Sequence, residues 1–210
     1  MLHRLSFRAM GCEMLAVLDS DSESAPVVLD VIPAWFEEWE QSLSRFRLNS
    51  ELSLLNRTFD QPIRVSDTLW NVFQTALRAD ELSGGHVTPT ILDAVVEAGY
   101  DRPFDEMAFF QKESSLPVLF KAHPLSMVVT ESTQRTINLP KGVRLDFGGV
   151  AKGWAAHQTV KRLQRYGPCL MNAGGDIAIS GPQADGSPWP IGVSNPFETG
   201  ADFEVLKLKR

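Results

Sequence analysis

The chain has 210 residues, of which 43% are apolar and 22% are charged, and its formal net charge is −6. This length allows one large domain or two small, intimate ones, and the composition is typical of a globular core. The acidic balance argues against nucleic acid as the main partner, because phosphate backbones are bound by basic faces. We also expect no membrane span, since no stretch is long and apolar enough.

The two cysteines, Cys12 and Cys169, fit neither a zinc spacing nor a disulfide framework. The Ala-Met-Gly-Cys stretch that ends at Cys12 is similar to a lipoprotein cleavage site. The few residues before it include His3, Arg4 and Arg8, so they form no apolar signal region. The simplest expectation is therefore a cytoplasmic location, unless a leader has been lost.

The first third of the chain predicts two strands followed by a helix. Residues 2–20 are apolar-rich and alternate loosely, which indicates two strand-like pieces around Gly11. Apolar side chains in residues 26–46 recur at helical spacing. Pro33 lacks the backbone N–H that a helix interior needs, so we expect a kink or a late start there.

The middle of the chain predicts a second and a third helix. Ser66 is a good N-cap for the helix that follows it, and the glycine pair 84–85 ends that helix. A short helix is expected within residues 90–99, after Pro89. Residues 102–125 contain three prolines and predict a long irregular crossing.

The last third predicts mainly strands. Residues 126–130, 136–140 and 142–147 are three candidates, and turn-separated apolar runs continue from Cys169 to Lys209. Helices early and hairpin-like strands late predict an α+β fold, with mixed helices and antiparallel sheet, rather than a regular βαβ alternation.

One helix in this strand-rich part begins at an unusual sequence, Leu-Asp-Phe-Gly-Gly-Val-Ala-Lys. Free N–H groups at a helix N-terminus favour an anion. Lys152 in the first turn opposes the helix dipole, which makes sense if it reaches an anion bound there. Asp146 can accept hydrogen bonds from a ligand or orient the loop. The alternative is a strand–helix connection that needs Gly148 and Gly149 only for an unusual turn.

A second glycine pair, Gly174 and Gly175, follows Asn172 after a short apolar strand. The structural interpretation is a β-turn or bulge between two strands. The functional interpretation adds that the glycines let a flat ligand approach the backbone.

These two glycine segments, LDFGGVAKGWAAH and NAGGDIAISG, resemble those of the ApbE family of FAD:protein FMN transferases. Upstream segments agree in order: FRAMGC, EWEQSLSRFRLNSELSLLN and SGGHVTPTI, followed after the glycine segments by PWPIGVSNP. The resemblance covers nearly the whole chain, so it implies one ApbE-like domain over residues 1–210.

The resemblance implies a set of site residues, each at a position that matches a family motif. Met10 corresponds to a residue that lines the flavin pocket, and Phe46 to an aromatic, often tyrosine, that contacts FAD. The stretch from His86 to Thr88 corresponds to three residues that meet the adenosine part. The full set is Met10, Phe46, His86, Val87, Thr88, Asp146 and Lys152 for FAD, with the Gly149 carbonyl for a metal.

The implied reaction moves FMN from FAD to a Thr or Ser hydroxyl of an acceptor protein, and AMP leaves. Mg²⁺ suits such an oxygen-rich phosphate site. No nucleophile is assigned, because the acceptor protein brings the hydroxyl. His3, His86, His123 and His157 do not cluster at ligand spacing, so ordinary loop histidines are expected, with His86 the exception.

Three departures from the family pattern leave a second function open. Thr88 stands where the family has aspartate, and Cys12 where it has threonine. The family's C-terminal segment with side-chain metal ligands is not found before Arg210. The alternative is a catalytically impaired FAD-binding protein of the same family.

Overall fold

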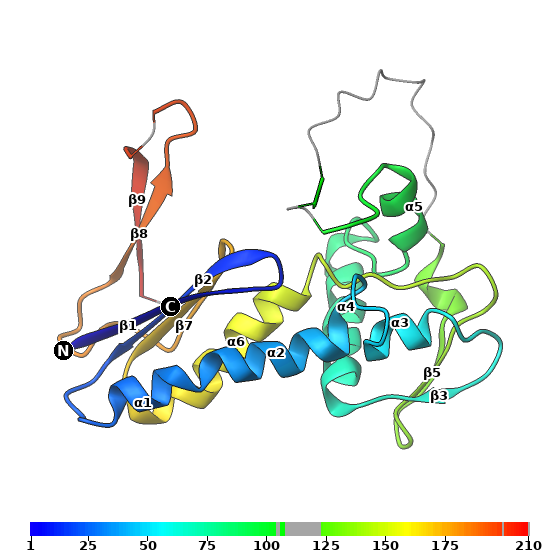
Figure 1. Ribbon diagram of the computed structural model, residues 1–210, viewed down its shortest axis with the longest axis horizontal. Helices are drawn as coiled ribbons and strands as arrows, with labels where there is room; N and C mark the ends of the chain where they lie inside the picture. Colours follow the sequence, from blue (N-terminus) through cyan, green and yellow to red (C-terminus); the bar gives the residue numbers. More distant parts are fainter. Residues whose placement is uncertain (104–105, 108–122, 199, 210) are drawn as a thin grey trace. The chain divides into compact units, whose positions relative to one another are not determined.

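The computed structural model describes residues 1–103, 106–107, 123–198 and 200–209. Helices and antiparallel strands make up the chain (Figure 1), which confirms the predicted α+β class. The chain divides into two compact units. Unit 1 comprises Met1–Trp35 and Ala155–Arg210, and unit 2 is Phe36–Trp154.

Unit 1 contains a four-stranded antiparallel sheet with the order β1-β2-β6-β7. The two predicted N-terminal strands around Gly11 are confirmed. Met10 and Gly11 both have positive φ, 48° and 72°, as the two central residues of a type I′ β-hairpin turn require. The central strand β6 is buried along most of its length. The strands are β1 (Leu2–Ala9), β2 (Cys12–Asp19), β6 (Cys169–Ala173) and β7 (Asp176–Ile179).

A separate two-stranded ribbon, β8 (Trp189–Ser194) and β9 (Asp202–Leu208), also belongs to unit 1. Trp189 is buried together with Val17 and Leu170. Its indole N–H donates to the Gly181 carbonyl at 2.7 Å, so the ring is buried without losing its hydrogen bond. The C-terminal strands predicted from the turn-separated runs are confirmed.

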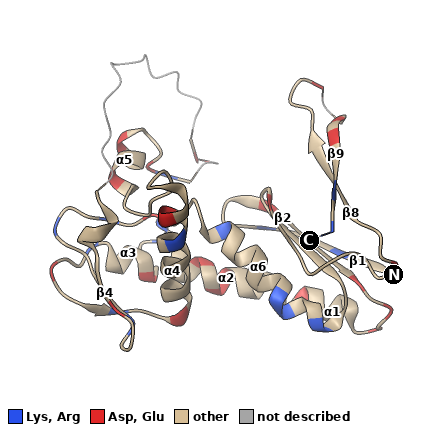
Figure 2. Cartoon of the chain, turned by 180° about the vertical axis from the view of Figure 1, so that it is seen from behind, with Lys and Arg blue, Asp and Glu red and all other residues tan. Residues whose placement is uncertain are grey.

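The predicted helix over residues 26–46 is two helices, α1 (Ala25–Asp30) and α2 (Ile32–Leu43). Pro33 lies in the first turn of α2, where a missing N–H costs nothing, so the late start is confirmed. The last turn of α6 (Ala151–Leu163) contains Lys161 and Arg162, which complement the negative end of the helix dipole. Figure 2 shows basic positions on α6 in blue. A short 3₁₀ turn, η3 (Gln164–Tyr166), follows it.

Unit 2 is built around α4 (Asp67–Ser83), which buries Leu69, Trp70, Val72, Phe73 and Ala76. Ser66 caps it by accepting from the Leu69 N–H, and Gly84 ends it at φ 63°, both as predicted. The other elements of unit 2 are α3 (Glu51–Leu55), α5 (Leu92–Glu97), η2 (Leu125–Met127) and a small antiparallel sheet of β3 (Ile63–Arg64), β5 (Thr136–Asn138) and β4 (Val129–Glu131).

The predicted strand over residues 142–147 is wrong. Its side chains do alternate, with Val143, Leu145 and Phe147 buried. However, its backbone pairs with a side chain rather than with a strand. The Asn56 amide donates to the Leu145 carbonyl at 2.8 Å and accepts from the Leu145 N–H at 2.7 Å. One buried amide thus satisfies the groups that a neighbouring strand would have satisfied.

Most of the predicted irregular crossing over residues 102–125 lies outside the described residues. Among the helices of the described ranges, none is long and apolar enough to cross a membrane.

Candidate functional site

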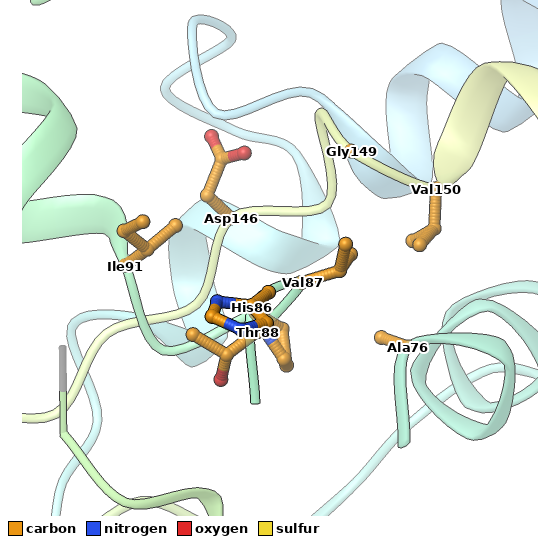
Figure 3. Close-up of a pocket in the computed structure, with 9 residues that line it drawn as sticks. Ala76, His86, Val87, Thr88, Ile91, Asp146, Gly149 and Val150 are labelled. Carbon is orange, nitrogen blue, oxygen red and sulfur yellow. The ribbon is translucent and has the colours of Figure 1, made fainter. Parts of the chain in front are cut away.

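Unit 2 contains a pocket of about 230 Å³ between three segments of the chain (Figure 3). One wall is Ala76 of α4, the second is the stretch 86–91, and the third is the loop 146–150 that leads into α6. The lining residues are Ala76, His86, Val87, Thr88, Pro89, Ile91, Asp146, Gly149 and Val150. Five of the positions predicted from the family motifs, His86, Val87, Thr88, Asp146 and Gly149, therefore line one pocket.

The wall from His86 to Ile91 is held by hydroxyl groups. The Val87 N–H donates to the Ser83 hydroxyl at 2.9 Å, which ties this wall to the end of α4. The Thr88 and Thr90 hydroxyls lie 3.0 Å apart, and Thr90 donates in turn to the His123 carbonyl at 2.5 Å. The Thr88 hydroxyl is thus part of a short polar chain at a largely apolar pocket.

Asp146 connects the loop 146–150 to the wall formed by residues 86–91. Its backbone N–H donates to the Pro89 carbonyl at 2.8 Å. One carboxylate oxygen accepts from the Gly148 N–H at 2.7 Å, and the other pairs with Arg45 Nε at 2.8 Å. In Figure 3 the carboxyl group points away from His86 and Thr88. As placed here, the carboxylate fixes the loop and pairs with a buried cation.

The glycine pair does not make the unusual turn that the sequence suggested. Neither Gly148 nor Gly149 has φ in the left-handed region. The reason for glycine at 148 is space, because a Cβ there would lie 2.9 Å from Asp146 Oδ1. A Cβ at 149 would make only an ordinary contact, 3.7 Å from Val87 Cγ1. The helix begins at Ala151, so Lys152 lies in its first turn as predicted.

The remaining predicted residues do not line the pocket. Lys152 lies in the first turn of α6. The centres of the Phe46 and Tyr100 rings lie 5.6 Å apart, and the Arg45 guanidinium lies over both rings. Met10 belongs to unit 1, in the β1–β2 turn. Arg45 links Phe46 to the pocket, because it lies over the Phe46 ring and pairs with Asp146, which lines the pocket.

The second glycine pair forms the β6–β7 turn of unit 1, which confirms the structural interpretation. Gly174 and Gly175 have φ of 62° and 100°, and the Gly175 N–H donates to the Asn172 side chain at 2.8 Å. Approach of a flat ligand to this turn stays a prediction.

Comparison with known proteins decides the family. The model of the ApbE family matches residues 10–210. The chain belongs to the ApbE family. A FAD:protein FMN transferase of Vibrio cholerae serotype O1 is 26% identical over 84% of this chain and 52% of its own length, and one of Treponema pallidum is 28% identical over 82% and 51%. The chain thus spans about half the length of these curated relatives.

Solved ApbE structures show the same fold. An ApbE protein from Thermotoga maritima superposes with a TM-score of 0.84 at 20% identity, over 100% of this chain and 68% of that one. Flavin transferase ApbE from Vibrio cholerae gives 0.76 at 21% identity, over 99% and 68%. At such identities the likeness establishes the architecture.

The ApbE reaction was expected to use Mg²⁺, with the Gly149 carbonyl as one ligand. Among the described residues, no group of three or more His, Cys, Asp or Glu side chains could hold a metal ion. The nearest carboxylate in sequence, Asp146, already uses both oxygens. Among the described residues, no such side-chain cluster therefore accompanies the Gly149 carbonyl.

Two residues of the candidate site were missed from the sequence. Arg45 lies within the quoted motif around Phe46, but its spacing gives no sign that it reaches Asp146. Asn56 ends the same motif, and its role depends on Leu145, 89 positions later. Long-range pairing of this kind has no local signal in one sequence.

Proposed function

We propose that the protein is a FAD:protein FMN transferase. One observation supports this most: five positions from two separate ApbE motifs line one pocket. His86, Val87 and Thr88 come from one motif, and Asp146 and Gly149 from the other. Curated relatives that match most of this chain carry that name.

The proposed reaction balances as a phosphoryl-group transfer. The oxygen of a Thr or Ser hydroxyl on the acceptor protein bonds to the phosphorus on the FMN side of FAD. The bond from that phosphorus to the bridging oxygen breaks, and AMP leaves with the bridging oxygen. The hydroxyl proton is released. The products are a protein–FMN phosphoester and AMP.

The pocket suits one end of FAD rather than the whole molecule. Its volume of about 230 Å³ lies below the range of about 300–1,000 Å³ found for sites that enclose a drug-sized ligand. Val87, Ile91 and Val150 give it apolar walls for a flat base, and the Thr88 hydroxyl offers a polar group. We therefore assign the adenosine end of FAD to this pocket.

Three further predicted residues stay in the proposal outside the pocket. Lys152, in the first turn of α6, has the charge to attract a phosphate. Phe46 offers an aromatic ring for the flavin part, as its family counterpart implies. Met10 belongs to unit 1, and its role stays what the family motif implies.

A second candidate function is FAD binding without transfer. The observation that favours it is the state of Asp146, whose two carboxylate oxygens are engaged by Gly148 and Arg45. A carboxylate so engaged is a poor additional ligand for Mg²⁺, which demands near-ideal oxygen geometry. Such a protein would hold FAD and leave it intact.

The deciding experiment mixes the chain, FAD, Mg²⁺ and an acceptor protein, and follows AMP by chromatography and the acceptor mass by mass spectrometry. The control is the same acceptor with its target Thr or Ser changed to Val or Ala. A transferase releases AMP in proportion to FMN-labelled acceptor, and only with the hydroxyl present. Bound FAD without AMP release supports the second function, and no FAD binding contradicts both.

A further inference from the structure

Arg45 is an arginine that the fold has buried beside the pocket. Its side chain is only 8% exposed, and Nε lies 2.8 Å from Asp146 Oδ2. The guanidinium carbon lies 4.1 Å from the centre of the Phe46 ring and 4.4 Å from that of Tyr100. The planar cation therefore contacts two aromatic faces and one carboxylate at once.

The bend that holds Arg45 is itself fixed by hydrogen bonds. It follows α2, and the Ser44 carbonyl accepts from the Ser50 hydroxyl, the residue that caps α3. Arg47, two residues on, pairs instead with Glu37 of α2 at 2.8 Å and does not line the pocket. The Ser50 hydroxyl therefore ties the backbone next to Arg45 to the start of α3.

Packing alone does not account for this arginine. Its Nη2 is buried and has no hydrogen-bond partner among the described residues. A buried ion pair is often no more stable than apolar side chains of similar volume, and an unsatisfied donor adds a cost. Buried polar groups left in this state are uncommon in native proteins and call for an explanation, such as a functional role.

The contact with Asp146 supplies such a role. Arg45 and the Gly148 N–H hold one carboxylate oxygen each, so together they fix the carboxylate plane. The backbone of Asp146 is bonded to Pro89, within the facing wall of the pocket. A change in the Asp146 side chain would therefore move both the loop that leads into α6 and the position of the wall.

We propose that Arg45 is a positioning residue for FAD binding that acts through Asp146. It rests on the proposed function, because it takes FAD as the ligand of the pocket. Arg45 keeps the Asp146 carboxylate on the Gly148 N–H, and this holds the loop 146–150 in the shape that receives the adenosine end. Arg45 also fixes the Phe46 ring beside this loop.

The test is a double-mutant cycle on FAD affinity, measured by flavin fluorescence titration of the full chain. The variants are Arg45→Met, Asp146→Asn and the double variant, with Arg47→Met as the matched control from the same bend. We expect Arg45→Met to weaken FAD binding by about tenfold to a hundredfold, the loss that goes with a charge-assisted contact. Arg47→Met should stay within about twofold of the wild type.

Coupling separates positioning from a general structural role. If Arg45 acts through Asp146, the double variant binds FAD no more weakly than the weaker single variant, because one pathway has already been broken. Effects that multiply in the double variant would overturn the inference, and so would an unchanged affinity in Arg45→Met. Thermal unfolding of each variant checks that the variant is folded at the temperature of the titration, so that a weaker affinity reflects binding and not unfolding.

The experiment also allows for a variant that does not fold and for a wild-type chain that does not bind FAD. If Arg45→Met does not fold, Arg45→Lys and Arg45→Gln replace it in the cycle, since both keep side-chain donors of similar length. Lys should recover part of the affinity that Gln loses, and equal affinities in Lys, Gln and wild type would overturn the inference. A wild-type chain that fails to bind FAD overturns the proposed function, and the inference with it.

Discussion

In unit 2, the Asn56 side chain makes the backbone hydrogen bonds that a neighbouring strand would otherwise make. Its amide makes two hydrogen bonds with the backbone of Leu145, and both residues are buried. This side chain therefore helps to hold the loop that carries Asp146, at the residue next to it.

Replacing Asn56 should cost stability out of proportion to its size. Asn56→Ala leaves the Leu145 N–H and carbonyl buried without these partners, at about 1–3 kcal/mol each, so we expect a loss of about 2–6 kcal/mol. Urea unfolding measures it. Asn71→Ala, on the exposed side of α4, is the control and should change the free energy of unfolding by less than about 0.5 kcal/mol. Similar losses in both variants would contradict this role.

Cys169 should be unreactive in the folded chain. It is fully buried, and burial raises the pKa of its thiol from 9.0 to about 11, against a smaller opposite effect of the Ser180 hydroxyl. The thiolate is the nucleophile, so a thiol reagent at pH 7.5 should label the partly exposed Cys12 and leave Cys169 unlabelled until urea is added. Labelling of both at equal rates in the folded state would contradict the burial.

The same thiol gives a pH dependence with a definite sign. The folded pKa is raised, so the stabilising contribution is complete below about pH 9 and is lost as the pH rises toward 11. In Cys169→Ala this part of the decline in unfolding free energy should disappear. A wild-type curve parallel to that of Cys169→Ala from pH 8 to 11 would show that the thiol ionises equally in both states.

At the scale of elements, the loop 146–150 and the start of α6 form one continuous structural segment. Gly148 allows the Asp146 carboxylate to approach the backbone N–H, and Ala151 then begins the helix. Close approach, not an unusual φ, is what the glycine provides here.

Two glycine-to-alanine changes in this segment should have opposite effects. Gly148→Ala places a Cβ 2.9 Å from Asp146 Oδ1, and that oxygen cannot move without losing its hydrogen bond, so FAD binding should weaken by about tenfold. Gly153→Ala meets no atom within 4 Å inside α6 and should stabilise the chain by about 0.5–1 kcal/mol. FAD titration and thermal unfolding of both variants check this. Unchanged FAD affinity in Gly148→Ala would show that the close approach of Asp146 to residue 148 is not needed for FAD binding.

Elements with local signals were predictable, and elements with distant partners were not. α4 has a capping serine, an apolar stripe and a terminal glycine, and all three lie within its own sequence. The alternation in residues 142–147 correctly predicted burial. It could not reveal that Asn56, rather than a strand, pairs with the backbone. The break before Pro33 follows from the chemistry of one residue, so it was found.

At the scale of the molecule, the candidate site follows from motifs rather than from patterns of hydrophobicity. The match of residues 10–210 to the ApbE family confirms the resemblance, and the pocket gathers five of the positions that it implied. Arg45 and Tyr100 had no such signal, since their roles depend on side-chain packing around Asp146 and Phe46. The contributions of Lys152 and Met10 stay predictions.

The most direct measurement of the central claim is competition for FAD by its two halves. The claim is that the pocket in unit 2 receives the adenosine end. FAD is bound to the chain, and AMP or FMN is then added while flavin fluorescence and bound FAD are followed. We expect AMP to displace FAD, and we expect Val150→Phe, which narrows the pocket, to weaken the binding of AMP and FAD together while FMN binding is unaffected. Displacement by FMN alone, or AMP binding that Val150→Phe leaves unchanged, would contradict it.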